Sequence, residues 1–183
     1  MYKTDITYTQ SYTTRFHSLV YCSLAKNLKK ERPLFHIDYK NKHLQIVSQY
    51  PPDINNMKAF MNIDSISISY YLDKMKTVRD GSRFKFSIDT LPQYSHNGQR
   101  FPILKSDFQK QWFIHKSNQY GFFFYSLEQN PIIRRGKYGA TLYGCNFSGN
   151  LIVTDYQKFT EALLHGIGHG KAWGFGLLRI LPL

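Results

Sequence analysis

The strongest constraint on the fold of this chain is an order of strand-like and helix-like segments that occurs twice. Apolar residues that alternate with polar ones indicate strands, and apolar residues three or four positions apart indicate helices. In the first half these patterns predict strands at 3–9, 34–39, 43–49, 66–72 and 84–88, with helices over 16–28 and after Pro52. The order is roughly β-α-β-β-α-β, which is typical of a ferredoxin-like unit.

The second half repeats this order without an obvious repeat in sequence. Its predicted strands are 101–104, 121–128, a hairpin within 130–153 and a last strand at 175–181. A helix is expected over 106–116, with Phe108, Trp112 and His115 on one face, and another from Thr154. We therefore expect an α+β protein of two tandem ferredoxin-like (RRM-like, βαββαβ) domains, residues 1–91 and 92–183.

The charge of the chain restricts its partners. Lysine and arginine total 24 against 12 acids, which gives a net charge of +12. An excess of this size points to a polyanion, with nucleic acid the first choice and an anionic membrane surface the second. Aromatic residues make up 16% of the chain and could stack on bases, which favours RNA or single strands. The alternative is a basic soluble protein whose aromatic side chains mostly form its core.

Other features indicate a soluble, cytoplasmic protein without a membrane partner. No apolar run approaches the length of a membrane-spanning helix, and the sequence MYKTDITYTQ lacks the apolar stretch of a signal peptide. Cys22 and Cys145 lie far apart and belong to no CxxC pattern. We expect both to be buried, reduced thiols.

The ending GIGHGKAWGFGLLRILPL resembles a nucleotide-binding loop only superficially. A dinucleotide fingerprint needs GxGxxG between a strand and a helix, but Lys171 stands at the sixth place and the element order is reversed. A P-loop would need glycine at 165 and Ser or Thr at 172, where the chain has His165 and Ala172. We therefore expect no nucleotide cofactor.

Two interpretations of this glycine-rich loop remain open from the residues alone. Successive glycines can expose N–H groups and allow the backbone of a polynucleotide to approach, with Lys171 supplying charge. Alternatively, Gly166 ends a helix and the loop is a close-packed turn.

The same ending strongly resembles the C-terminal signature of the CasE family, the CRISPR repeat-processing endoribonucleases of the Cascade complex. That signature runs approximately G-[IV]-G-P-[GA]-K-[AS]-x-G-x-G-L-L-S-[LV]-x-P. The chain departs from it at His169, where proline is usual, and at Arg179, where serine is usual. The matching positions are Gly166, Ile167, Gly168, Gly170, Lys171, Ala172, Gly174, Gly176, Leu177, Leu178 and Pro182.

The resemblance extends over the chain, through PLFHIDYKNKHLQIVSQ, GSRFKFSI and NGQRFPI with the Trp-bearing helix after it. It implies tandem ferredoxin-like domains and a cut without metal or cofactor at the base of the hairpin in a CRISPR repeat transcript. In such a cut the RNA's own 2′-OH attacks the adjacent phosphate and leaves a 2′,3′-cyclic phosphate. The enzyme then stays on the mature guide RNA as a Cascade subunit.

The resemblance also implies the catalytic residues. The segment RFHSLV places His17 at the family's general acid/base, whereas without the family it would be taken for a surface histidine. The family tyrosine three residues earlier is Thr14 here, so Tyr12 or Tyr21 takes over its role or the role is absent. Lys171 matches a family lysine expected to contact phosphate near the cut. The loss of the tyrosine keeps open a second hypothesis, an RNA-hairpin-binding subunit that does not cut.

The remaining candidates are expected to bind RNA. Arg134, Arg135 and Lys137 lie at a predicted hairpin tip, where the family places a basic hairpin against the RNA stem. Lys26 extends the positive face beside the first helix, although such charges are often only solvated. The candidates in the glycine-rich loop are Gly166, Gly168, His169 and Gly170.

Overall fold

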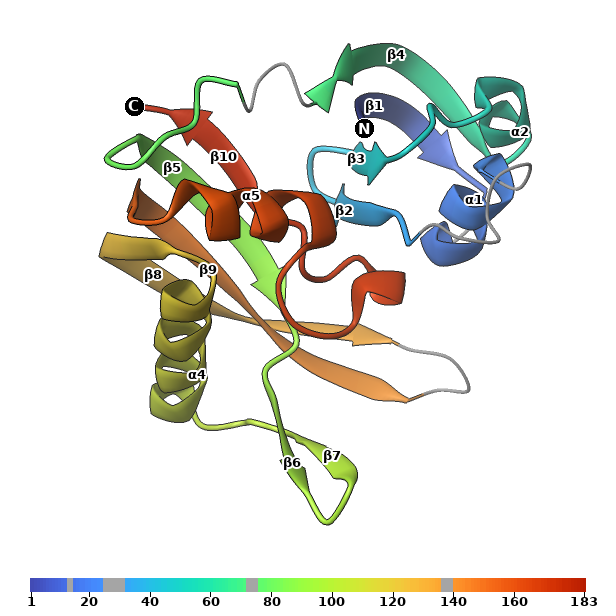
Figure 1. Ribbon diagram of the computed structural model, residues 1–183. Helices are drawn as coiled ribbons and strands as arrows, with labels where there is room; N and C mark the ends of the chain where they lie inside the picture. The colour runs from blue at the N-terminus through green and yellow to red at the C-terminus, as the bar shows by residue number, and fades with distance from the viewer. Residues whose placement is uncertain (13–14, 25–31, 72–75, 136–139) are drawn as a thin grey trace. The chain divides into compact units, whose positions relative to one another are not determined.

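The computed structural model describes residues 1–12, 15–24, 32–71, 76–135 and 140–183 (Figure 1). Contacts between residues divide the chain into two compact units. The first holds Met1–Thr77 together with the short segment Lys171–Gly174, and the second holds Val78–Gly170 and Phe175–Leu183. The division thus falls between residues 77 and 78, whereas the sequence pattern placed it near residue 92.

The first unit has the ferredoxin-like order of elements. Its four strands form one antiparallel sheet in the order β2-β3-β1-β4, so the two central strands are the first and third in the chain. This arrangement confirms the fold predicted for the first half. The elements are β1 (Tyr2–Ser11), α1 (Phe16–Ser23), β2 (Leu34–Asp38), β3 (His43–Ser48), α2 (Ile54–Lys58) and β4 (Met61–Tyr70).

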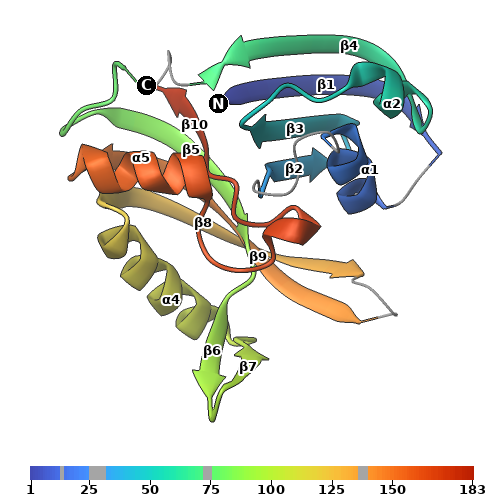
Figure 2. The ribbon, with the colours of Figure 1, turned by 45° about the vertical axis from the view of Figure 1, so that its right-hand side comes forward.

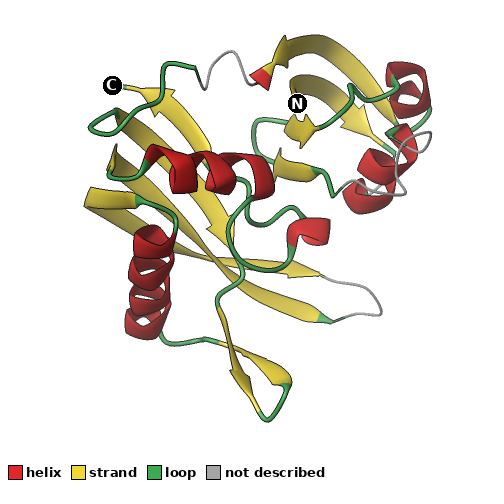
Figure 3. Cartoon of the chain, in the orientation of Figure 1, coloured by secondary structure: helices red, strands yellow, loops and turns green. Residues whose placement is uncertain are grey.

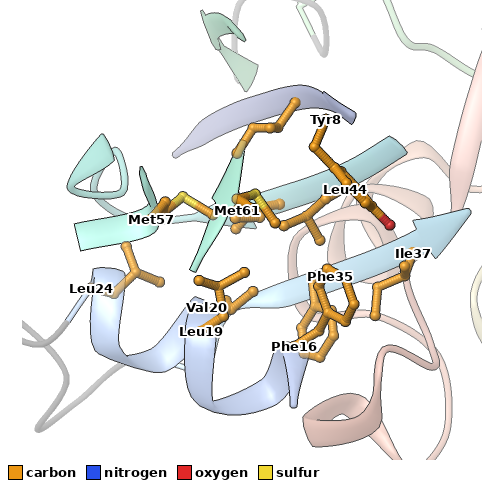
Figure 4. Close-up of a cluster of buried hydrophobic side chains, with 12 residues drawn as sticks. Tyr8, Phe16, Leu19, Val20, Leu24, Phe35, Ile37, Leu44, Met57 and Met61 are labelled. Atoms are coloured by element: carbon orange, nitrogen blue, oxygen red, sulfur yellow. The ribbon is translucent and has the colours of Figure 1, made fainter. Parts of the chain in front are cut away.

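The core of the first unit lies between α1 and its sheet (Figure 4). Phe16, Leu19 and Val20 form the buried stripe of α1, and they meet strand residues such as Phe35 and Leu44. Full burial of each such side chain contributes about 1.5–3 kcal/mol, so this stripe fixes which face of α1 is turned away from the sheet. Cys22 lies outside the stripe and is exposed, which contradicts the expectation that it is buried, whereas Cys145 is buried.

The second unit repeats the fold with one insertion (Figures 2 and 3). Its four-stranded antiparallel sheet has the order β10-β5-β9-β8, and the hairpin β6–β7 forms a separate two-stranded sheet. The elements are β5 (Arg83–Thr90), β6 (Gln93–His96), β7 (Gln99–Pro102), α4 (Ser106–Gln119), β8 (Phe122–Arg135), β9 (Thr141–Val153), α5 (Tyr156–His165) and β10 (Arg179–Pro182).

Two predicted strands of this region join other sheets than the sequence pattern indicates. Residues 84–88 belong to β5, which opens the second sheet and does not add to the first. Residues 101–104 are not the first strand of the second sheet. Residues 101 and 102 instead end the exposed strand β7, which pairs with β6 in a separate hairpin. The patterns for these strands were sound, but a strand's periodicity does not say which sheet it joins.

The strands β8 and β9 form a longer hairpin than the sequence indicates. The segment 121–128 and the start of 130–153 are one continuous strand, β8, which passes through Pro131. A proline lacks the N–H for a ladder hydrogen bond, so it is tolerated here because β8 is an edge strand of the sheet.

The helix α4 packs on the second sheet through a different face from the expected one. Phe113 is fully buried, and its ring stacks on that of Phe147 with 4.3 Å between centroids. Phe108 is 60% exposed and His115 is exposed, so the predicted face is wrong. Phe113 packs on the sheet because its ring stacks on the aromatic rings there, including that of Phe86.

None of the helices within the described residues is long and apolar enough to span a membrane.

Candidate functional site

The predicted catalytic histidine lies at the start of α1. His17 follows Phe16, whose side chain is buried against the sheet, and one residue turns a helix by about 100°. The imidazole is therefore directed to the flank of the buried stripe and is partly exposed. The first unit thus presents His17 at its surface without removing an apolar residue from its core.

Two aromatic rings flank the His17 imidazole. The Tyr21 ring, one turn later on α1, has its centroid 4.4 Å from that of His17. The indole of Trp173 is stacked on the imidazole at 5.9 Å and an interplanar angle of 25°. Trp173 ends the 3₁₀ turn η2 (Lys171–Trp173), which contacts α1 and β2 within the first unit.

Trp173 contacts the candidate catalytic histidine, and the sequence did not reveal this contact. It occupies a variable position of the C-terminal signature, and no spacing links it to His17. Of the two tyrosines considered, Tyr21 contacts His17, whereas the Tyr12 hydroxyl donates a hydrogen bond to Asn62 Oδ1 at 3.0 Å. Thr14, the position of the family tyrosine, lies outside the described residues.

The surroundings of His17 favour its neutral form. Partial burial lowers the pKa of the imidazole below its usual value of 6.5, because the charged form loses more hydration than the neutral one. The ring is therefore neutral at pH 7 and able to accept a proton.

Replacement of Trp173 by alanine is expected to raise the pKa of His17. Loss of the indole exposes the imidazole to water, and a desolvated histidine moves back toward 6.5 when solvent returns. The titration can be followed by NMR of the histidine ring protons, with His17 assigned by the His17→Asn variant. Trp112→Phe is the matched control, because Trp112 lies on α4 in the second unit. An unchanged His17 pKa in Trp173→Ala would contradict the stacking contact.

Lys171 lies close to a second cation, Arg32, in the first unit. Burial, and then the nearby positive charge of Arg32, lower the pKa of the Lys171 ammonium. Within the described residues, neither of these two cations forms an ion pair with a carboxylate. Two close cations without an acid attract an anion such as phosphate.

The glycine-rich loop is held by its own hydrogen bonds. Gly166 ends α5 with φ 70°, and its N–H donates to Ala162 at 2.8 Å. The N–H of Ile167 donates to Gly176 at 2.9 Å, and that of Phe175 to Gly170 at 3.3 Å. This geometry supports the reading of Gly166 as a helix end.

The remaining loop candidates lie between these closures. Gly168 faces the Trp112 ring, and Gly170 faces Phe175 and Leu91. His169 is exposed between the two glycines. Both neighbouring glycines have a positive φ, a backbone conformation that glycine adopts without strain.

The basic hairpin places its two described arginines differently. Arg135 is exposed at the end of β8. The side chain of Arg134 is 12% exposed and forms an ion pair with Asp89 of β5. Lys137 and Lys26 lie outside the described residues.

The described part of the chain contains no group of three or more His, Cys, Asp or Glu residues that could hold a metal ion.

The comparisons with solved structures agree on the fold. The chain superposes on the CRISPR endoribonuclease Cse3 bound to a 19-nt RNA with a TM-score of 0.85, at 16% identity and covering 99% of this chain and 98% of the other. For the CRISPR-associated protein Cas6e from Escherichia coli K-12 the TM-score is 0.73 at 18% identity, with both chains fully covered. For a chain of a CRISPR RNA-guided surveillance complex the TM-score is 0.65 at 18% identity, and both chains are again fully covered.

The family follows from the sequence profile. No curated protein matches the sequence. The profile of the family described as CRISPR associated protein matches residues 3–182, almost the whole chain. This match confirms the resemblance that the C-terminal signature indicated. The chain is therefore a member of the CRISPR associated protein family.

Proposed function

We propose that this protein is an endoribonuclease that cuts CRISPR precursor RNA at the base of the repeat hairpin and stays bound to the guide RNA as a Cascade subunit. The observation that carries this proposal is the site in the first unit, where a neutral, ring-flanked His17 accompanies the cationic segment of Lys171. The family membership and the similarity to RNA-bound Cse3 and to a surveillance-complex chain support it.

The proposed reaction uses the RNA's own 2′-OH as nucleophile. Neutral His17 accepts the proton of that hydroxyl as its oxygen attacks the adjacent phosphorus. The bond between phosphorus and the 5′-oxygen breaks, and that oxygen takes a proton from water, so the products are a 2′,3′-cyclic phosphate and a 5′-OH. His17 then returns its proton to the solvent. Lys171 and Arg32 stabilise the charge that develops on the phosphoryl oxygens. Atoms balance without a metal or an external nucleophile.

The stem of the hairpin is proposed to bind mainly through charge. A-form RNA has a deep, narrow major groove that side chains cannot read, so contacts to phosphate dominate. Arg135 and the loop residues Gly168, His169 and Gly170 are the proposed contacts among the described residues, and Lys137 and Lys26 remain candidates from the sequence.

A non-catalytic RNA-binding subunit is the second candidate function. The observation in its favour is Thr14, which replaces the family tyrosine. The contact of Tyr21 with His17 supports the cleaving enzyme instead, with Tyr21 proposed as the substitute for that tyrosine.

The proposal is tested by incubating the purified chain with its cognate repeat hairpin in EDTA. We expect one cut at the hairpin base, with a 2′,3′-cyclic phosphate detected by mass spectrometry, and persistent binding to the product. Cleavage that stops in EDTA and returns with Mg²⁺ would contradict the reaction proposed. Tight binding without any product would establish the second candidate instead.

A further inference from the structure

A buried carboxylate organises one end of the second sheet. Asp89 of β5 is 5% exposed, and Arg134 of β8 donates to its Oδ2 atom. The Asn146 amide donates to Oδ1 at 2.8 Å, and Arg179 Nη2 lies 3.8 Å from the same oxygen. These partners keep the carboxylate charged inside the unit, so loss of Arg134 would leave that charge poorly compensated.

Arg134 also covers a phenylalanine of the glycine-rich loop. The guanidinium carbon lies 4.5 Å from the centroid of the Phe175 ring, and Phe175 is fully buried. Two glycines make room for this ring, because a Cβ atom at Gly144 would come within 2.6 Å of it and one at Gly170 within 3.0 Å. Phe175 is therefore packed against backbone and under a cation, an arrangement that favours a single position.

The same residues close the ends of the segment Lys171–Gly174. The N–H of Phe175 donates to the carbonyl of Gly170 at 3.3 Å, and the N–H of Gly176 donates to the carbonyl of Asp89 at 2.7 Å. Asp89 thus holds the loop directly through its carbonyl and indirectly through its carboxylate and Arg134. The segment between these closures carries Lys171 and Trp173.

We propose that Arg134 is a positioning residue, not a ligand of the RNA, and that with Asp89 it fixes both ends of the segment that carries Lys171 and Trp173. Its guanidinium is occupied on one edge by Asp89 and on one face by Phe175, and it is only 12% exposed. Contact with phosphate would require it to leave a buried carboxylate. The catalytic consequence of this inference rests on the proposed function, whereas the ordering of the loop does not.

The first experiment measures the loop without any RNA. Hydrogen exchange of the backbone amides of Phe175 and Gly176 is followed by NMR in the full chain. In Arg134→Ala and in the milder Asp89→Asn, we expect exchange at these amides to be at least about tenfold faster, because their hydrogen bonds open more often. Arg83→Ala is the matched control, since Arg83 is an exposed arginine on the same strand as Asp89. Unchanged exchange in both test variants would overturn the inference.

The second experiment separates positioning from phosphate contact. The salt dependence of hairpin binding and the cleavage rate at saturating RNA are measured for the same variants. In Arg134→Ala and Asp89→Asn the rate is expected to fall by roughly 10- to 100-fold, because small displacements of catalytic groups are costly. The slope of log affinity against log salt should stay unchanged. Arg135→Ala should instead reduce that slope by about one unit, as loss of a phosphate contact does.

The outcomes distinguish this inference from the proposed function. Arg134→Ala that reduces the salt slope as Arg135→Ala does, with normal loop exchange, would make Arg134 an RNA ligand and overturn the inference. If the unaltered chain never cleaves its hairpin but the loop amides of both variants exchange faster, the positioning role stands and the proposed function fails.

Discussion

A repeat hairpin with a single 2′-deoxyribose immediately upstream of the cut will remain intact in the presence of the protein. In the proposed reaction the nucleophile belongs to the substrate, so removal of that one oxygen leaves His17 with no proton to accept. Cleavage should fall below detection, while binding changes little because the stem and its phosphates are unaltered. Single-turnover gel assays and filter binding measure the two quantities on the same RNA.

The matched control carries the deoxyribose one nucleotide further from the cut and should be cleaved normally. Cleavage of the modified hairpin at the original position would show that water or another group attacks the phosphorus. The role proposed for His17 would then have to be reassigned, although RNA binding would be unaffected.

Loss of the His17 imidazole is expected to have the second-largest effect. General acid–base catalysis contributes about 10²- to 10⁴-fold, so His17→Ala should lower the cleavage rate at saturating RNA by that factor. Affinity for the hairpin should be retained, because the neutral imidazole contributes no charge to phosphate binding. His17→Gln keeps a polar side chain of similar size but does not titrate, and it should be equally slow.

His165→Ala is the matched control for this prediction. His165 is exposed at the end of α5 and lies 3.3 Å from Glu161, and its loss should leave cleavage unchanged. An equal fall in affinity and in rate for His17→Ala would identify His17 as a docking residue. A normal rate would remove it from the mechanism.

The elements of the fold were largely predictable, but their partners were not. Periodicity located β1 and α5 because each buries one face, and that pattern is local. The assignment of β5 to the second sheet depends on pairing with β9, more than fifty residues later, which no local pattern records. The buried face of α4 also depends on distant residues, because Phe113 stacks on Phe147 of β9. The pattern within the helix therefore indicates the wrong face.

The sequence could indicate members of the candidate site only where a family motif includes them. His17 and Lys171 follow from the resemblance, whereas Trp173 occupies a position that the signature leaves variable. The sequence also shows Arg134 and Arg135 as an equivalent pair, and only the fold separates them by directing one side chain to Asp89. Alternation along a strand predicts that the side chains of Arg134 and Arg135 point to opposite faces of the sheet. It does not predict that one of them forms an ion pair with a buried carboxylate.

The inclusion of Lys171–Gly174 in the first unit has a consequence for biosynthesis. Domains generally fold as the ribosome releases them, beginning from the N-terminus. When residues 1–77 have emerged, the first sheet and its helices can form, but Trp173 and Lys171 have not yet been translated. A nascent chain therefore exposes His17 without its indole partner and without the proposed phosphate-binding lysine. Under the proposed function, the cleavage site is therefore completed only when Lys171 and Trp173 have been translated, well after the first sheet can form.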